Sequence, residues 1–228
     1  MQRIARKTAS WEVYSGIKAR GPLLVRADGR GFKKILEGSK KPYDIDFARS
    51  IVGAAELFFA VSGLDPGLAF VFSDEVNLLF PQAPFGGRIE KLDSVIAGFL
   101  SGALSLSLAR VVSMDSRVIP ICRDEASTYL SERQDETWRN HVFSYGFYAL
   151  VSDGQSHAQA MDILRGMKES QIHEMLFKRD INLARTPVWE RRGVLVYRRG
   201  GEIVQDWEPP LFLSPEGLKL VEELSGQS

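Results

Sequence analysis

The sequence predicts an α+β fold with a βαββαβ core, followed by a helical and β-hairpin C-terminal extension. Three observations support this class: short apolar runs that end in polar turns, two long helical periods between them, and a mainly helical texture after residue 123. Of the 228 residues, 44% are hydrophobic and 25% are charged, which is ordinary for a soluble globular protein. We expect a core domain over residues 1–122 and a second region over residues 123–228 that packs on it.

The first core strand lies within residues 22–32, PLLVRADGRGF, after a short helix predicted over residues 8–18. The apolar run ends in Asp28-Gly29-Arg30-Gly31, which puts a carboxylate at the end of a strand. The glycines let a backbone or a phosphate approach closely. This segment is either a plain hairpin turn or one part of a metal site.

A helix is predicted from Asp44 to Val61, because apolar residues recur at helical spacing and Asp44 or Asp46 is placed to cap its start. A basic, glycine-containing loop precedes it. Lysines in this loop are near enough to Asp28 in the chain to receive a polyphosphate, although a solvated surface loop has the same composition. These lysines are Lys33, Lys34, Lys40 and Lys41.

The stretch from Phe70 to Phe80, FVFSDEVNLLF, predicts a tight hairpin, because two apolar runs flank Ser73-Asp74-Glu75. Crowding acids at the tip of a buried sheet costs free energy unless a cation offsets it. If this hairpin neighbours the first strand, Asp28 converges with the two acids of the turn. Oxygen-rich clusters of this kind suit Mg²⁺, whereas the alternative is again a plain turn.

The core is completed by a long helix over residues 88–110 and a strand over residues 116–121. Arg88 and Lys91 lie near the start of the helix, where its dipole disfavours cations, so they indicate either an anionic ligand or ordinary surface charge. Pro120 suits an edge strand. The resulting order is that of a ferredoxin-like or palm domain, with the first strand and the hairpin adjacent at the sheet centre.

Beyond residue 123, helices are predicted over residues 126–151, 156–166, 169–178 and 214–224, with Ser156 and Ser170 as N-caps of the second and third. The most basic stretch, Arg185 to Arg199, predicts an arginine-rich hairpin with Trp189 and Trp207 nearby. It is the best local candidate for contact with a phosphate backbone, and a solvated ribbon is the alternative. Its cations are Arg185, Arg191, Arg192, Arg198 and Arg199.

Charge and cysteine content restrict the partners. Lys plus Arg and Asp plus Glu both number 29, so a nucleic acid must be bound by a local patch rather than by the field of the whole chain. The single Cys122 excludes an intramolecular disulfide, and three histidines give no Cys/His zinc spacing. Because the N-terminus has no signal-peptide core and no run approaches roughly 18 apolar residues, we expect a soluble cytoplasmic protein without a membrane partner.

Eight segments together resemble the tRNA-His guanylyltransferase family, specifically its Thg1-like members, which polymerise in the 3′–5′ direction. They run in the family's order over roughly residues 22–198 and are VRADGRGF, KKPYD, FSDEVNLLF, GRIEKL, DSRV, YLSERQ with Asn140, HEMLF with Ile181-Asn182, and RRGVLVYR. The resemblance implies a polymerase-palm fold.

The same resemblance implies site residues. Asp28 and Asp74 would bind two Mg²⁺ ions with the carbonyl of Gly29, and Glu75 would be a third, supporting catalytic acid. The implied nucleotide-binding residues are Arg26, Gly29, Arg30, Gly31, Phe32, Lys33, Lys41, Asp44, Ser73, Arg88, Lys91 and Arg117. The expected RNA contacts are Arg133, Asn140, Arg185, Arg191, Arg192 and Arg198.

The implied reaction is nucleotidyl transfer to the 5′ end of tRNA, in which ATP or GTP activates the 5′-phosphate, carried out by a homo-oligomer, a tetramer or a dimer. Residues 138–144 keep only Asn140 of a family segment tied to non-templated guanylate addition, and Lys33 and Ile172 replace a family histidine and lysine. These departures favour templated repair of 5′-truncated tRNA. The alternatives are a palm-domain nucleotide cyclase with the same metals, and a non-catalytic RNA-binding module.

Overall fold

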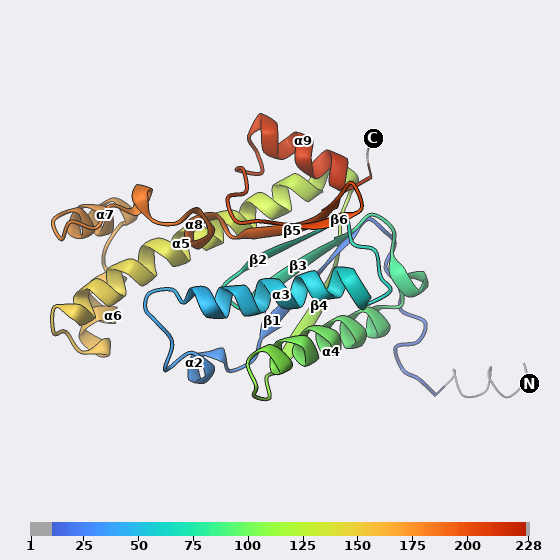
Figure 1. Ribbon diagram of the computed structural model, residues 1–228, viewed down its shortest axis with the longest axis horizontal. Helices are drawn as coiled ribbons and strands as arrows, with labels where there is room; N and C mark the ends of the chain where they lie inside the picture. The colour runs from blue at the N-terminus through green and yellow to red at the C-terminus, as the bar shows by residue number, and fades with distance from the viewer. Residues whose placement is uncertain (1–10, 227–228) are drawn as a thin grey trace, which may run out of the picture.

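Six strands form one antiparallel sheet in the order β4-β1-β3-β2-β5-β6, with helices on both faces (Figure 1). The computed structural model describes residues 11–226. The strands are β1 (Leu23–Gly29), β2 (Leu68–Phe72), β3 (Glu75–Phe80), β4 (Met114–Pro120), β5 (Val194–Arg199) and β6 (Glu202–Asp206). The α-helices are α2 (Phe32–Ile35), α3 (Ile45–Val61), α4 (Ile89–Ser107), α5 (Ala126–Ser152), α6 (His157–Arg165), α7 (Glu169–Phe177), α8 (Val188–Arg192) and α9 (Pro215–Leu224). Three short 3-10 turns are η1 (Pro84–Gly87), η2 (Arg123–Glu125) and η3 (Leu183–Arg185).

The centre of the sheet is the pairing of β1 with β3, in which Asp28 lies opposite Glu75. β4 pairs with the other side of β1 and is an edge strand, so Pro120 lies where its missing N–H is tolerated. The predicted βαββαβ order, the adjacency of the first strand to the hairpin and the edge position of Pro120 are therefore confirmed.

The two faces of the sheet bury different side chains, because successive strand residues point to opposite sides. Val25 and Leu78 pack with Phe58 of α3 and Ile96 of α4, and all four are fully buried in one core. Complete burial of side chains of this size contributes roughly 1.5–3 kcal/mol each. Leu24 instead faces the opposite core.

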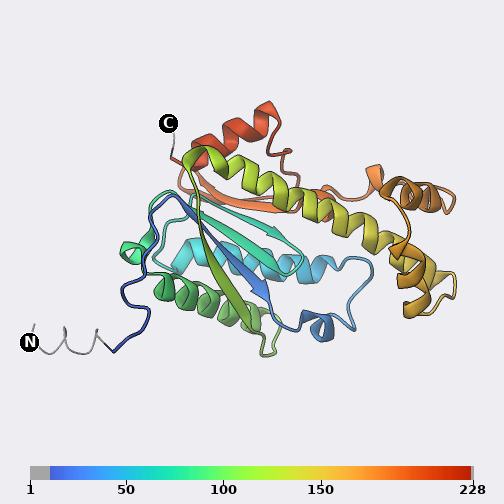
Figure 2. The ribbon, with the colours of Figure 1, turned by 180° about the vertical axis from the view of Figure 1, so that it is seen from behind.

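That second face is covered by α5, which crosses it diagonally, together with α9 (Figure 2). The first half of α5 buries Leu130 against the sheet, where Phe212 also packs. Its second half leaves the sheet and buries Val142 with Leu164 of α6 and Leu176 of α7. With 27 residues at 1.5 Å each, α5 is about 40 Å long and belongs to both cores.

The β5–β6 hairpin, predicted as part of the extension, continues the core sheet through the pairing of Val71 in β2 with Val194. The β2 edge would otherwise expose unpaired backbone groups, and β5 covers them. Gly193 opens the strand at φ 75°, and a Cβ there would lie 2.5 Å from the Phe70 ring, so glycine is required.

Three local predictions differ from the structure. Within the expected 8–18 helix, residues 11–18 form turns and one bridge, from Lys18 to Arg88, and residues 8–10 lie outside the described residues. Ser170 is not an N-cap, because α7 already begins at Glu169, whereas Ser156 caps α6 as predicted. The expected basic loop contains the short helix α2. No helix within residues 11–226 has the length and hydrophobicity to cross a membrane.

Candidate active site

Two carboxylates meet where β1 ends and the β2–β3 turn begins. The backbone N–H of Gly29 donates to the carbonyl of Asp74 at 3.1 Å, which fixes the two chain segments together. Burial raises the pKa of Asp74, and the negative charge of Asp28 raises it further. The sequence prediction that Asp28 converges with both acids of the turn is matched by the geometry for Asp74, whereas Glu75 forms no three-acid cluster with them in the described part of the chain.

Glycine is the only residue type that fits at position 29, between the carboxylates and the following helix. A Cβ at this position would lie 2.7 Å from Oδ2 of Asp74 and 2.3 Å from the ring of Phe32. Ser73 holds the other side of the turn: it has φ 50°, and its hydroxyl donates to Oδ1 of Asp74 at 3.2 Å. The Asp74 carboxylate is therefore held close to the β1 backbone.

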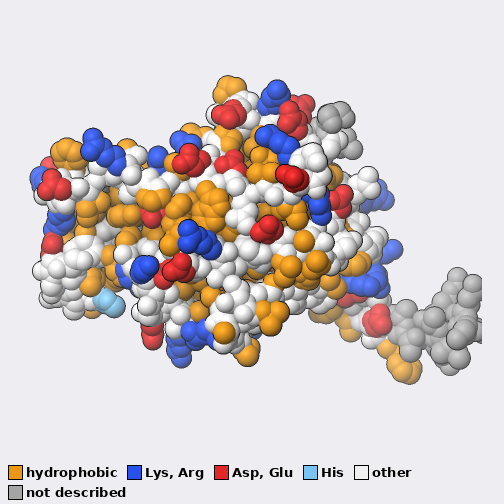
Figure 3. Space-filling view, in the orientation of Figure 1, with side chains coloured by type: hydrophobic (Ala, Val, Ile, Leu, Met, Phe, Trp, Pro, Cys, Tyr) orange, Lys and Arg blue, Asp and Glu red, His pale blue; other side chains and the backbone are white. Residues whose placement is uncertain are grey.

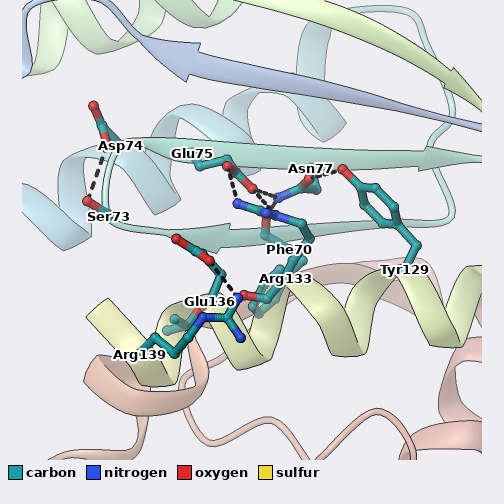
Figure 4. Close-up of polar contacts among 10 residues, drawn as sticks. Phe70, Ser73, Asp74, Glu75, Asn77, Tyr129, Arg133, Glu136 and Arg139 are labelled. Carbon is teal, nitrogen blue, oxygen red and sulfur yellow. Dashed lines mark hydrogen bonds and ion pairs between the residues drawn. The ribbon is translucent and has the colours of Figure 1, made fainter. Parts of the chain in front are cut away.

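Glu75 is directed differently, towards α5 (Figure 4). Its carboxylate accepts two hydrogen bonds from Arg133, at 2.9 and 2.7 Å, and a third from Asn77 at 2.8 Å. Tyr129 donates to Asn77 at 3.0 Å, and the Arg133 guanidinium lies 5.3 Å from the centre of the Phe72 ring. We call these residues, Phe72 apart, the Glu75 network; they are Glu75, Asn77, Tyr129 and Arg133.

The Glu75 network leaves Asp28 and Asp74 as the acids open to a metal ion. No group of three or more His, Cys, Asp and Glu side chains in the described part of the chain is arranged as a metal cluster. Mg²⁺ does not require one, because it keeps several waters and binds through one or two carboxylates plus substrate phosphates. Two crowded carboxylates, one of them desolvated, fit such an ion together with the Gly29 carbonyl.

A cavity of about 230 Å³ opens beside this turn, between the start of α3, α5 and α8. Five residues predicted from the sequence line it: Lys40, Lys41, Asp44, Ser73 and Asn140. Asp44 caps α3 by accepting from the N–H of Asp46 at 2.9 Å, and backbone hydrogen bonds, that of Lys40 first, lower its pKa. The Lys41 ammonium donates to the carbonyl of Leu36 at 2.6 Å.

The DGRGF segment turns directly from the carboxylates into α2. Gly31 has φ 70° and precedes the helix, and Phe32 is buried with its ring 5.9 Å from that of Phe47. Arg30 and Lys33 are exposed beside it. The Phe32 ring therefore packs against Gly29 beside the carboxylates, and Arg30 and Lys33 remain exposed and able to contact a polyanion.

Arg26 and Arg117 lie directly opposite each other on β1 and β4. Nε of Arg26 is buried without a hydrogen-bond partner. Arg117 is exposed and forms a 3.4 Å ion pair with Asp115. Like charges on facing strand positions are unfavourable unless an anion joins them, so this pair remains a candidate phosphate contact.

The structure does not bring Arg88 and Lys91 to the carboxylates. Both lie at the start of α4, which follows the end of β3 at Phe80, at the opposite end of the sheet from the Asp74 turn. Lys91 is 4.9 Å from the centre of the Phe85 ring, and Arg88 bridges to Lys18.

The residues predicted to contact RNA are dispersed. Arg133 is committed to the Glu75 network, with 19% of its side chain exposed. Arg185 is exposed in η3, and Arg191 and Arg192 lie in α8 next to the cavity. Arg198 lies at the far end of β5 and donates to the carbonyl of Phe59.

Other cavity residues were not predicted from the sequence, notably Tyr43, Trp189 and Glu190. Tyr43 packs edge-on to Trp189 at 5.9 Å. Glu190 is 8% exposed and accepts from the hydroxyl of Tyr145 at 2.7 Å. The only signal in the sequence was a single acid inside the basic run WERR, which does not reveal a buried position.

Two carboxylates at adjacent strand ends of a βαββαβ sheet, beside a cavity, define the palm class of fold. Residues 6–132 match the family described as tRNAHis guanylyltransferase, and residues 124–216 match its Thg1 C terminal domain. The chain belongs to the tRNAHis guanylyltransferase family, whose named members are nucleotidyltransferases.

Named relatives are distant. The chain is 29% identical over 193 residues to a probable tRNA(His) guanylyltransferase of Dictyostelium discoideum, covering 78% of this chain and 75% of that protein. It is 24% identical over 205 residues to tRNA(His) guanylyltransferase 1 of Arabidopsis thaliana, covering 83% of this chain. That match spans only 36% of the plant protein, so the chain corresponds to about a third of its length.

Solved structures share the fold. A bacterial tRNA(His) guanylyltransferase (Thg1)-like protein in complex with ATP has a TM-score of 0.80 at 22% identity, covering 98% of both chains. A complex with GTP has a TM-score of 0.78 at 21% identity, covering 98% of this chain and 99% of that one. The Saccharomyces cerevisiae tRNA(His) guanylyltransferase has a TM-score of 0.70 at 23% identity, covering 80% of this chain and 86% of that one.

Proposed function

We propose that the chain is a Mg²⁺-dependent nucleotidyltransferase that adds nucleotides in the 3′–5′ direction to the 5′ end of tRNA. The observation that carries the proposal is the proximity of Asp28 and Asp74, at the end of β1 and in the β2–β3 turn, next to a cavity lined by Lys41 and Asp44. Family membership adds support, as do the bacterial relatives bound to ATP and GTP.

The reaction consists of two displacements at phosphorus. The 5′-phosphate of the tRNA first attacks the α-phosphorus of ATP or GTP and releases pyrophosphate. The 3′-hydroxyl of an incoming nucleoside triphosphate then attacks the activated 5′-phosphorus and releases the nucleoside monophosphate. Because both steps proceed in line at phosphorus, one set of protein groups serves both by positioning the reactants and neutralising charge.

Asp28, Asp74 and the carbonyl of Gly29 would hold the metal. When bound, two Mg²⁺ ions activate the attacking hydroxyl and stabilise charge on the phosphoryl oxygens. Lys41 lines the cavity, and Arg30 and Lys33 are exposed just after Gly29 in the chain; we assign all three to the triphosphate, while the cavity takes the base of one nucleotide. Ser73 keeps Asp74 in position through its hydroxyl.

For the tRNA itself, we propose contacts in residues 123–228, the region we regard as the second domain. On the face shown in Figure 3, described Lys and Arg side chains are interspersed with Asp and Glu rather than forming a continuous stripe. A neutral chain of this kind would hold an anionic substrate better as a homo-oligomer, in which a neighbouring copy supplies cations. A tetramer in the cytoplasm, acting in templated repair of 5′-truncated tRNA, is the form we favour.

The test is incorporation of a labelled nucleotide into 5′-truncated tRNA. Asp28→Ala and Asp74→Ala are each expected to lower the rate by roughly 100-fold or more, because each removes a carboxylate that would hold the metal, and the metal would stabilise charge in the transition state. Asp162→Ala is the matched control, since this acid pairs with Arg165 on the surface of α6 and is 70% exposed. Near wild-type activity of either Asp28→Ala or Asp74→Ala would contradict the proposal.

Incubation with nucleoside triphosphate alone separates the alternatives. A cyclic nucleotide formed without RNA would identify a cyclase. If the protein binds tRNA without turnover, and Asp28→Ala binds tRNA equally well, the protein is an RNA-binding module. Comparing truncated tRNA-His with C or A opposite the added position then tests whether the addition is templated.

A further inference from the structure

Glu190 is a buried carboxylate at the cavity wall without an ion-pair partner. It is 8% exposed, and none of the ion pairs among residues 11–226 includes it. Burial raises the pKa of Glu190, and the hydrogen bond from Tyr145 partly offsets this. A desolvated acid with one hydroxyl partner is costly for the fold, which suggests that it has a role towards a ligand.

Tyr145 holds the Glu190 carboxylate in place, and Tyr43 lies near it. Tyr145 donates to Oε2 at 2.7 Å, and the Tyr145 ring lies 6.2 Å from that of Tyr43. Burial raises the pKa of Tyr43, and the negative charge of Glu190 raises it further, so the carboxylate and this phenol are close. An ionised carboxylate has about four acceptor sites, of which Tyr145 uses one, so others remain for a ligand.

The cavity has the size and walls of a base site. About 230 Å³ is less than the roughly 300–1,000 Å³ of pockets for drug-sized ligands, so it suits a fragment such as a base rather than a whole nucleotide. Phe47, Ile51 and Val52 supply apolar walls, and Trp189 adds an indole. Ser73 places the opening next to Asp74, where the phosphates would lie.

We propose that Glu190 selects guanine in this cavity, an inference that rests on the proposed nucleotidyltransferase function. The Watson–Crick edge of guanine presents two neighbouring donors, N1–H and the 2-amino group, and a carboxylate accepts from both. Adenine presents one donor beside the acceptor N1, which the ionised carboxylate repels. Hypoxanthine keeps N1–H but lacks the 2-amino group, so it ranks between the two.

The experiment measures binding of GTP, ITP and ATP, with Mg²⁺ and without tRNA, by titration calorimetry. The wild type is expected to bind GTP roughly tenfold or more tightly than ATP, with ITP intermediate, as for other bidentate readouts of a base edge. Glu190→Gln keeps the volume and an acceptor for Tyr145 but offers only one acceptor to guanine, so the GTP/ATP ratio is expected to fall towards one.

Two control variants are available. Tyr145→Phe removes the hydroxyl but keeps the carboxylate, so it should keep a preference for GTP. Glu136→Gln changes an acid of α5 that pairs with Arg139 outside the cavity, and it should leave all three affinities unchanged.

The outcomes distinguish this inference from the function on which it rests. Nucleotide binding with the same GTP/ATP ratio in wild type and Glu190→Gln, or with no preference in the wild type, would overturn the role of Glu190 alone. Absence of nucleotide binding in the wild type would overturn both. Circular dichroism shows whether Glu190→Gln is folded. If it is not, the test rests on the order of affinities of the wild type, which should be GTP, then ITP, then ATP, and any other order refutes the inference.

Discussion

Replacing Arg133 with methionine should destabilise the protein much more than removing a surface arginine from the same helix. Arg133 is bound through two hydrogen bonds to Glu75, and the two side chains are 19% and 9% exposed. Methionine keeps much of the stem that packs over Phe72 but leaves the carboxylate buried without its cation. Removing one partner of a buried ion pair costs roughly 3–5 kcal/mol.

The expected loss lies near the lower end of that range, about 3 kcal/mol, because Asn77 still donates to the carboxylate at 2.8 Å. For a chain of this size, each kcal/mol lowers Tm by about 2–4 °C, so Tm should fall by about 6–12 °C. Glu75→Gln in the Arg133→Met background removes the uncompensated charge and should recover part of this loss. The coupling between the two changes should be about 2 kcal/mol, within the range for contacting residues.

Urea unfolding of the wild type, both single variants and the double variant measures this coupling. Arg139→Met is the matched control, because Arg139 lies on the same helix and its ion pair with Glu136 has side chains 60% and 37% exposed. Such surface pairs contribute only about 0–1 kcal/mol. Equal losses for Arg133→Met and Arg139→Met, or strict additivity in the double variant, would refute the structural role of this ion pair.

Three further changes test the site directly. Gly29→Ala should abolish nucleotide incorporation and lower Tm, because its Cβ would lie 2.3 Å from the Phe32 ring and 2.7 Å from Asp74 Oδ2. Gly38→Ala is the control: a Cβ there has no neighbour within 4 Å, so incorporation and Tm should stay unchanged. Equal behaviour of the two variants would contradict the steric role of Gly29. Asp74→Asn should inactivate the protein yet raise Tm at neutral pH. The pKa of Asp74 is raised in the folded state, so its ionised form destabilises the fold. This destabilisation is complete at pH values above the folded-state pKa and absent at pH values below the unfolded-state pKa. Thermal melts should therefore converge at acidic pH, and a gain that persists there would count against the pKa argument. Asp44→Ala should cost about 1 kcal/mol at neutral pH by removing the α3 cap, and because the folded pKa of Asp44 is lowered, the charge-dependent part of the loss should fade as pH drops through that pKa. Urea unfolding of the wild type and Asp44→Ala at neutral and at acidic pH measures this loss. A loss of stability that is equally large in acid would show that the charge of Asp44 plays no part.

The core of the fold was predictable because its strands and helices have clear periods, and because the βαββαβ order admits few arrangements. That order alone places Asp28 beside the β2–β3 turn. It also shows why Arg88 and Lys91 lie elsewhere: a helix that follows β3 starts at the opposite end of the sheet from the turn that precedes β3. Strand direction, rather than local helix electrostatics, is decisive for those two cations.

The partner of Glu75 could not be predicted in the same way. Arg133 is 58 positions away in the sequence, and its pairing depends on where α5 crosses the sheet. A local pattern identifies a helix and its period, but the crossing position follows from tertiary packing. The same limit applies to Glu190, whose burial depends on the contact of α8 with α5.

In α5, by contrast, polar residues recur at helical spacing, and this pattern can be read in the sequence. Five residues at spacings of three and four occupy one side of this helix and meet the site in succession. Tyr129 and Arg133 belong to the Glu75 network, and Thr137, Asn140 and Ser144 line the cavity. A helix that packs on a sheet normally turns an apolar stripe inward, and here that stripe is polar where it passes the carboxylates and apolar again in its second core. The apolar amphipathicity of α5 is weak. This is the pattern expected for a helix whose middle lines a polar site and whose two ends are anchored in separate hydrophobic cores.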